Sequence, residues 1–199
     1  MTLIKFCGLS RPCDIDFCNE LKPEYIGFVF VHQSRRYILP ECAAKLKAGL
    51  SREIQSVGVF MNENINVIAN MASQNIFDII QLHGSEDDNY VRHLKYLTGK
   101  LIIKAFVIKS QHDIMQAYSS SADYVLLDSG TGTGQVFNWD MIKNFSRNYF
   151  LAGGLNPENV RDAINILNPF AVDTSSGIET NGFKDEIKMA AFVDAVRGG

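Results

Sequence analysis

The sequence predicts a single-domain α/β fold, a (β/α)8 barrel of the TIM-barrel class that spans residues 1–199. Eight short apolar runs, rich in β-branched residues, recur at intervals of roughly 20 to 30 residues. Segments with helical spacing separate them, as repeated βα units of a parallel sheet require. No Gly-x-Gly-x-x-Gly motif follows the first run, which argues against an open nucleotide-binding sheet. At 199 residues the chain can bury one core of this class.

The apolar runs predict the strands, whose side chains alternate between two faces. In the first run, Lys5 and Cys7 share a face that suits the barrel mouth, whereas Ile4 and Phe6 suit the layer of helices. The eight predicted strands are Leu3–Phe6, Tyr25–Phe30, Ile54–Phe60, Phe77–Leu82, Leu101–Ile108, Tyr124–Leu127, Tyr149–Leu151 and Phe170–Asp173.

Several predicted helices have recognisable ends. Pro40 opens a segment rich in Ala and Leu, and Ser85 precedes "EDDNYVRHLKYL" as a candidate N-cap. Asn156 followed by Pro157 combines an N-cap residue with proline at the first helical position. The last helix is expected near Asp185–Val196. No linker or low-complexity segment interrupts this alternation, so one domain is expected.

The composition excludes several classes of partner. The net charge of -3, without a Lys/Arg cluster, provides no basic surface for nucleic acid. No apolar stretch is long enough to span a membrane, and the N-terminal residues lack the features of a signal peptide. We therefore expect a cytoplasmic protein without a membrane partner.

The four cysteines, Cys7, Cys13, Cys18 and Cys42, all lie in the first quarter of the chain. They show no Cys-x-x-Cys spacing of a zinc ribbon or redox pair, and no His-x-x-x-His partner follows them. The sequence therefore predicts no metal site. The ordinary globular composition also argues against a disulfide framework.

Polar residues at strand ends matter most in such a barrel, because its reacting groups lie where strands meet the βα loops. Cys7 lies where the first strand gives way to its loop, and the nearby Lys5 is expected to favour its thiolate and to bring its pKa toward neutrality. A free cysteine can equally be a small buried apolar residue. Asp128 follows an apolar strand and is placed to act as a general acid, or to cap the glycine-rich turn after it.

Two loops of small residues occupy the positions where this fold binds phosphate. Gly153 and Gly154 follow the seventh strand, and Ser175, Ser176 and Gly177 follow the eighth. Such loops let backbone N–H groups approach a ligand closely. A glycine-rich loop is often a tight turn that binds no ligand. Two such loops at both expected places nevertheless indicate a phosphate site.

Three further features lie near strand ends. After the second strand, the adjacent Arg35 and Arg36 could bind a carboxylate in bidentate fashion, although paired arginines are usually solvated. His32 and His83 fit hydrogen-bonded loop residues better than bases, because no carboxylate spacing marks a triad. Further candidates for lining the barrel mouth are Lys5, His83 and Asp173.

These motifs together resemble the phosphoribosylanthranilate isomerase family of tryptophan biosynthesis. The similarity covers essentially the whole chain through "KFCG", "GFVF", "SRRY", "VGVF", "IIQLHG", "IKAF", "LLDSGTGTGQVFNW", "LAGGLNPENV" and "VDTSSGIE", in that order. The resemblance implies an Amadori rearrangement of N-(5-phosphoribosyl)anthranilate to 1-(2-carboxyphenylamino)-1-deoxyribulose 5-phosphate. It implies no cofactor and no metal, a phosphosugar as the small-molecule partner, and a monomer or homodimer.

The resemblance also implies roles for particular residues. Asp128 would protonate the furanose ring oxygen, and Cys7 would then remove the proton from C2 of the sugar. Arg36 would bind the anthranilate carboxylate, while the glycine and serine loops would hold the phosphate. Two departures from the family pattern, Thr131–Gly134 and Phe137–Trp139, affect the loop after the sixth strand, where Asn138 can still cap the next helix.

Other barrels that bind phosphosugars are alternatives. Indole-glycerol-phosphate synthase would show additional Lys and Glu groups at strand ends, and ribulose-phosphate epimerase would show Asp and His pairs suited to a metal. Neither array is present in the sequence. A non-catalytic phosphate-binding barrel would keep the glycine loops and lose the acid or the base, whereas both Cys7 and Asp128 are present.

Overall fold

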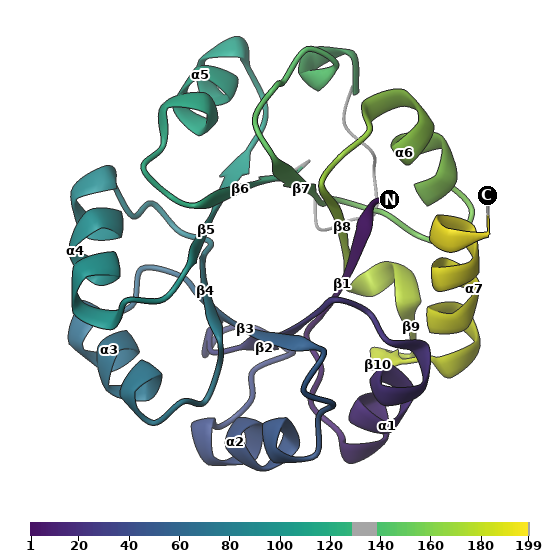
Figure 1. Cartoon of the computed structure of the whole chain (residues 1–199), viewed down its shortest axis with the longest axis horizontal. Helices are drawn as coiled ribbons and strands as arrows, with labels where there is room; N and C mark the ends of the chain where they lie inside the picture. The colour runs from purple at the N-terminus through teal and green to yellow at the C-terminus, as the bar shows by residue number, and fades with distance from the viewer. Residues whose placement is uncertain (129–138, 199) are drawn as a thin grey trace.

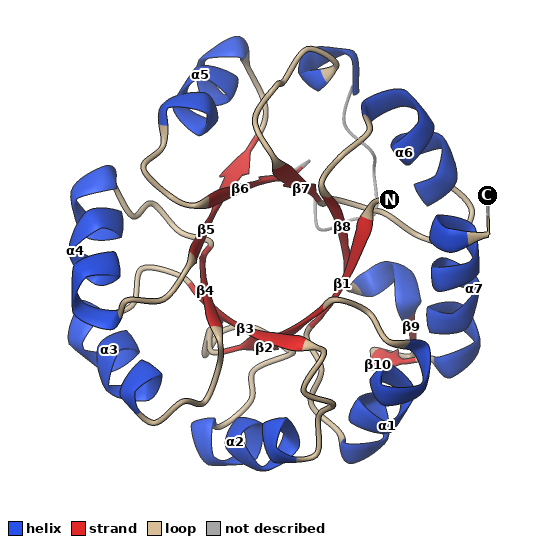
Figure 2. Ribbon diagram, viewed as in Figure 1, coloured by secondary structure: helices blue, strands red, loops and turns tan. Residues whose placement is uncertain are grey.

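Eight parallel strands close into a barrel in the computed structural model of the chain, which describes residues 1–128 and 139–198. The strands follow one another around the barrel in chain order, and the last pairs with the first (Figure 1). Helices surround this ring of strands (Figure 2). The predicted (β/α)8 class is confirmed.

Each predicted strand is present, with bounds shifted by at most two residues. The strands are β1 Leu3–Cys7, β2 Tyr25–Val29, β3 Gln55–Phe60, β4 Ile79–Leu82, β5 Ile102–Val107, β6 Tyr124–Asp128, β7 Tyr149–Leu151 and β8 Ala171–Thr174. They were recognisable because both faces of a parallel barrel strand are covered, which requires nearly continuous apolar sequence.

The α-helices alternate with the barrel strands along the chain, and the last one follows all the strands. They are α1 Pro12–Leu21, α2 Pro40–Ala48, α3 Ile65–Ser73, α4 Asp88–Thr98, α5 Gln111–Ser119, α6 Val160–Leu167 and α7 Glu186–Arg197. As predicted, Pro40 opens α2. The predicted N-cap at Asn156 is wrong, because α6 begins at Val160 with Asn159 at the cap position. The Asn156 side chain instead accepts hydrogen bonds from backbone N–H groups in the turn before the helix. The predicted N-cap at Ser85 is wrong. The cap of α4 is Asp87, whose carboxylate accepts from the backbone N–H of Tyr90 at 2.8 Å.

Between β6 and β7, the described residues form the short 3₁₀-helix η1 Trp139–Ile142 instead of an α-helix. The departures from the family pattern predicted for the loop after the sixth strand lie outside the described residues. They concern Thr131–Gly134, Phe137 and Asn138. None of the helices in the described part of the chain is both long and apolar enough to cross a membrane.

A small hairpin after β8 was not predicted. It follows the 3₁₀-helix η2 Ser176–Ile178 and consists of β9 Glu179–Thr180 and β10 Phe183–Lys184. Asn181 and Gly182 form its turn with φ of 54° and 84°, and an Asn-Gly pair is the typical sequence of such a turn. The hairpin carries Glu179 and Lys184 beside the barrel mouth.

Alternation along the strands separates two cores, one between barrel and helices and one inside the barrel. Ile4 and Phe6 pack in the outer core, whereas Leu3 packs against the inner core and the fully buried Lys5 is hydrogen-bonded across the barrel seam. The predicted division of faces in the first strand is thus confirmed. Side chains at odd and even positions of β1 point to opposite faces of the sheet. Cys7, the last residue of the strand, therefore reaches the mouth of the barrel.

Candidate active site

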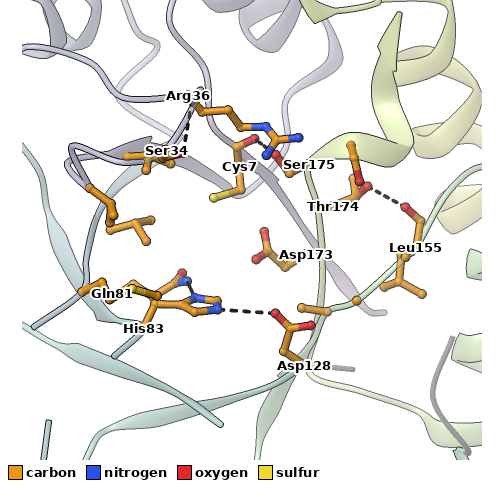
Figure 3. Close-up of a pocket in the computed structure, with 18 of the residues that line it drawn as sticks. Cys7, Ser34, Arg36, Gln81, His83, Asp128, Leu155, Asp173, Thr174 and Ser175 are labelled. Atoms are coloured by element: carbon orange, nitrogen blue, oxygen red, sulfur yellow. Dashed lines mark hydrogen bonds and ion pairs between the residues drawn. The ribbon is translucent and has the colours of Figure 1, made fainter. Parts of the chain in front are cut away.

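A pocket of about 520 Å³ lies at the ends of the strands where the βα loops begin. Its polar lining comes from segments that are far apart in the sequence, brought together because all eight strands run in parallel. Among its lining residues are Cys7, Arg36, Gln81, His83, Asp128, Asp173 and Ser175 (Figure 3).

Cys7 and Asp128 line the same pocket from β1 and β6. Figure 3 shows them on different sides of the space, with Asp173 between them in the view. Each is the last residue of its strand, so its side chain reaches the mouth while the preceding residues build the barrel. A thiol and a carboxyl that face one bound molecule can transfer protons at two of its atoms.

The Cys7 thiol is partly open to the pocket and otherwise enclosed by protein atoms. Gly27 is its neighbour on β2, and a Cβ atom at that position would lie 2.8 Å from the Cys7 Sγ. Burial raises the pKa of Cys7, and the opposing charges of Lys5 and Lys184 do not outweigh burial. The expectation that Lys5 brings this pKa toward neutrality is therefore wrong.

Lys5 lies beneath the pocket and is not among its lining residues. Its Nζ donates to Asp173 Oδ1 at 2.9 Å, so the cation is already paired with a carboxylate. Burial disfavours the charge on Lys5, but Asp173 and Cys7 outweigh burial and raise the pKa of Lys5. Burial also raises the pKa of Asp173, against the effect of Lys5. The short contact favours an ion pair whose carboxylate forms part of the pocket wall.

His83 lies in the pocket, as anticipated for a residue at the mouth. Its Nε2 is 3.4 Å from Asp128 Oδ2, and its Nδ1 is 3.1 Å from the Nε2 of Gln81. Gln81 was not singled out from the sequence. The available signal was a lone amide in the apolar run "FDIIQLHG", because a fully buried polar side chain needs a partner or a function.

Arg36 lines the pocket, and its guanidinium is already bound on one edge. Its Nε and Nη2 donate to the two carboxylate oxygens of Glu179 at 2.6 and 2.8 Å. Arg35 and Lys184 bind the same carboxylate at 2.9 and 2.7 Å. Burial disfavours the charge on Glu179, but Arg36 and Lys184 outweigh burial and hold the pKa of Glu179 below its usual range.

Glu179 and Lys184 were missed by the sequence reasoning. Both lie on the hairpin that was not predicted, and neither stands at the end of a barrel strand. Lys184 Nζ also donates to the carbonyl oxygen of Ser175 at 2.9 Å. The hairpin therefore connects Arg36 with the loop after β8.

The loops after β7 and β8 approach each other at the rim of the pocket. Gly153 and Gly154 line it with φ of 96° and 71°, a conformation that favours glycine. Ser175 and Ser176 line it from the other loop. Gly177 is not a lining residue, and a Cβ atom there would lie 2.0 Å from a backbone oxygen of the β7 loop.

No group of three or more His, Cys, Asp or Glu residues in the described ranges could hold a metal ion. The arrangement combines a thiol, a carboxyl group, a guanidinium and two loops rich in glycine and serine. A closed (β/α)8 barrel with such a mouth belongs to the class of barrel enzymes that act on small phosphorylated substrates.

Comparison with known proteins specifies the family within this class. The family model for N-(5'-phosphoribosyl)anthranilate (PRA) isomerase matches residues 4–195. The chain therefore belongs to the phosphoribosylanthranilate isomerase family, the isomerases of tryptophan biosynthesis that convert an aldose derivative into a ketose derivative. The resemblance found in the sequence is confirmed.

Curated relatives and solved structures agree with this membership. N-(5'-phosphoribosyl)anthranilate isomerase of Thermoanaerobacter sp. (strain X514) is 43% identical, with 100% of this chain and 99% of the relative covered. A phosphoribosyl anthranilate isomerase crystallised with reduced 1-(o-carboxyphenylamino)-1-deoxyribulose 5-phosphate has a TM-score of 0.90 at 36% identity, with both chains covered to 100%. A structure of monomers of the dimeric Thermotoga maritima isomerase has a TM-score of 0.89, with the same identity and coverage.

Proposed function

We propose that the pocket carries out the family's isomerisation with Asp128 as the general acid and Cys7 as the general base. The observation that supports these roles is that both side chains line one pocket from the ends of β6 and β1. The substrate would lie across the space between them. Proton transfers alone suffice for this reaction, so we expect no cofactor and no metal.

The first step is opening of the furanose ring. Asp128 donates its proton to the ring oxygen while the bond from C1 to that oxygen breaks, which leaves an iminium at C1. A ring oxygen leaves poorly as an alkoxide, so a proton donor at this atom is needed. His83 lies beside the carboxylate that remains on Asp128.

In the second step, Cys7 removes the proton from C2. The adjacent iminium makes this C–H bond acidic enough for a thiolate to act as the base. The electrons of the C–H bond form a C1=C2 double bond and neutralise the iminium, which gives an enolamine. Loss of the proton from the C2 hydroxyl and protonation at C1 then yield the aminoketose.

Arg36 would bind the anthranilate carboxylate of the substrate. Glu179 takes the guanidinium edge formed by Nε and Nη2, and the edge that includes Nη1 would receive the substrate. The guanidinium has five N–H donors in a rigid fork, so one arginine can serve two carboxylates. The two carboxylates would then lie on different edges of a single cation.

The substrate phosphate would bind between the loops after β7 and β8. Gly153 and Gly154 would offer backbone N–H groups, and Ser175 and Ser176 would offer theirs from the other loop, with Gly177 allowing the tight path of that loop. The relative crystallised with a 5-phosphate ligand binds a compound of the same class. We expect this chain to work as a monomer or a homodimer in the cytoplasm, and the T. maritima relative is dimeric.

The proposed roles are tested by supplying N-(5'-phosphoribosyl)anthranilate to purified protein and following the loss of its fluorescence. Cys7→Ala and Asp128→Asn should each lower kcat by about 10²-fold or more, the scale of a lost acid or base. Cys13→Ala serves as a control, because Cys13 is a free cysteine outside the pocket. Full turnover by either pocket variant would remove that residue from the mechanism.

A further inference from the structure

Gln81 is an anomaly in the barrel interior. Its side chain is fully buried, and it lies at the pocket floor on β4 between the apolar residues Ile80 and Leu82. Its Oε1 has no hydrogen-bond partner. In the described part of the chain, every other buried side-chain nitrogen or oxygen has one. An unpaired buried acceptor is destabilising, so its retention calls for a function.

The nitrogen of the Gln81 amide determines the tautomer of His83. The Gln81 Nε2 group can only donate, and it lies 3.1 Å from His83 Nδ1. The ring must then accept at Nδ1 and, when neutral, carry its proton on Nε2. That Nε2 faces Asp128 Oδ2 at 3.4 Å, as the dashed line in Figure 3 shows. Gln81, His83 and Asp128 therefore form a directed chain of donors.

We propose that Gln81 serves the isomerisation in two ways, an inference that rests on the proposed role of Asp128. Its Nε2–H holds His83 in the tautomer that donates to Asp128, which makes His83 a positioning residue. Its Oε1 accepts a hydrogen bond from a hydroxyl group of the bound sugar, which makes Gln81 a substrate-binding residue.

The chain of donors favours the transition state over the bound substrate. As the proposed acid, Asp128 carries its proton before ring opening, and its contact with His83 is then a hydrogen bond to an uncharged carboxyl group. As Asp128 gives its proton to the ring oxygen, it becomes a carboxylate, and the same contact becomes charge-assisted and stronger. An interaction that strengthens along the reaction raises kcat. Contacts of this kind are often long before substrate binds, as the 3.4 Å separation is here.

The unpaired Oε1 fits a sugar hydroxyl for a similar reason. A carbonyl oxygen can only accept, so it requires a donor from the ligand. The substrate carries hydroxyl groups on its ribose, and an unpaired acceptor selects a ligand that brings a donor to it. The Cys7 thiol and the Asp173 carboxylate line the same pocket, so the sugar would lie within reach of these groups.

Two variants separate the roles. His83→Phe keeps the ring volume and the Gln81 Oε1 but removes the donor to Asp128. We expect kcat to fall roughly 10- to 100-fold, the range for a lost hydrogen bond to a charged group. The Kd for reduced 1-(o-carboxyphenylamino)-1-deoxyribulose 5-phosphate, measured by calorimetry, should stay within about twofold. Gln81→Leu removes both roles, so it should lower kcat and also weaken binding of this ligand about tenfold.

A spectroscopic measurement tests the tautomer without turnover. In protein labelled with ¹⁵N at histidine, the His83 signals, identified by their loss in His83→Phe, should report protonated Nε2 and unprotonated Nδ1. This preference should disappear in Gln81→Leu. Gln74→Leu and His93→Phe, both at exposed positions, serve as matched controls. Thermal unfolding checks folding, and Gln81→Leu should be at least as stable as the parent, because it replaces an unpaired polar group.

Two results would overturn the inference. A protonated Nδ1 on His83 in the parent protein would exclude the donor chain, and an unchanged Kd in Gln81→Leu would exclude the hydroxyl contact. Failure of the proposed function is distinguishable from both. Full activity of Asp128→Asn would remove the acid, whereas the tautomer and the ligand Kd are measured independently of the role of Asp128.

Discussion

Cys7 combines a place at the pocket with a raised pKa. The protein encloses the sulfur and pairs the nearest cation, Lys5, with Asp173. The raised pKa favours the thiol over the thiolate that the proposed base role requires. A thiol of raised pKa is a stronger base once ionised, which suits removal of a proton from carbon.

The first prediction concerns the pH dependence of kcat/KM. The proposed reacting form of the pair holds one proton, on Asp128, with a thiolate at Cys7. The share of this form does not change with pH until the pair gains or loses a proton. Because burial raises the pKa of Cys7, kcat/KM should stay level through neutral pH and fall only above about 8.5, the usual thiol value. Initial rates measured across this pH range give the profile. A fall of kcat/KM with a midpoint below pH 8 would contradict a raised pKa of Cys7.

The second prediction concerns the space around the Cys7 sulfur. Gly27→Ala places a Cβ atom 2.8 Å from Sγ, so the thiol must turn away from its position. A displacement of about 1 Å at a reacting group can cost about 10²-fold in rate. We expect kcat to fall by that order while circular dichroism shows a folded barrel. Gly49→Ala is the control, since its new Cβ would meet no atom closer than 3.6 Å, and equal activity of the two variants would refute the role of this contact.

Sequence reasoning could find residues at strand ends but not their partners. Cys7 and Asp128 were predicted because each ends a strand, and the direction of parallel strands alone brings such positions to one mouth. The carboxylate that binds Arg36 comes from a residue 143 positions away. Whether the Gln81 Oε1 has a hydrogen-bond partner likewise depends on the residues that surround it in space. No local pattern encodes such contacts.

At the scale of elements, the strands were predictable and the connections less so. The strand from Tyr149 to Leu151 was predicted with its observed bounds. The cap of α4 was misplaced because Ser85 and Asp87 are both good N-cap residues, and Ser85 instead donates to Asn62. The hairpin after β8 could have been found from its Asn-Gly turn, yet its strands have only two residues each.

This hairpin connects the two regions of the mouth that are proposed to bind anions. Lys184 reaches the Ser175 loop, and Glu179 orients Arg36 by accepting from two of its nitrogens. Three cations around one carboxylate, with Arg35 as the third, leave excess positive charge beside the pocket. That excess favours a substrate with a carboxylate and a phosphate.

The third prediction concerns Glu179. Glu179→Gln removes one of the two oxygens that hold the Arg36 fork and puts an NH2 group there instead. Because Arg36 is remote from the bonds that break, KM should rise about tenfold and kcat should change little. Steady-state kinetics measure this split, with Glu53→Gln as an exposed control. A large loss of kcat with an unchanged KM would contradict an orienting role.

At the scale of the whole molecule, the closure of the barrel depends on pairing between the two ends of the chain. β1 and β8 pair in register, with Lys5 opposite Asp173. Their ion pair crosses this seam with a contact of 2.9 Å, and the ammonium is fully buried. Burial of an ion pair costs solvation, so the intact pair adds little net stability, whereas loss of one partner leaves an uncompensated charge.

The last prediction follows from this seam. Lys5→Met leaves the Asp173 carboxylate buried without its cation, so the free energy of unfolding should fall by about 3–5 kcal/mol, the usual result of breaking a buried pair. Lys5→Met combined with Asp173→Leu removes both charges and fills the space with apolar groups, which should restore most of the loss. Urea unfolding followed by circular dichroism measures both variants. If the double variant were no more stable than Lys5→Met, the destabilisation would stem from lost packing at the seam, and the uncompensated charge would not be its cause.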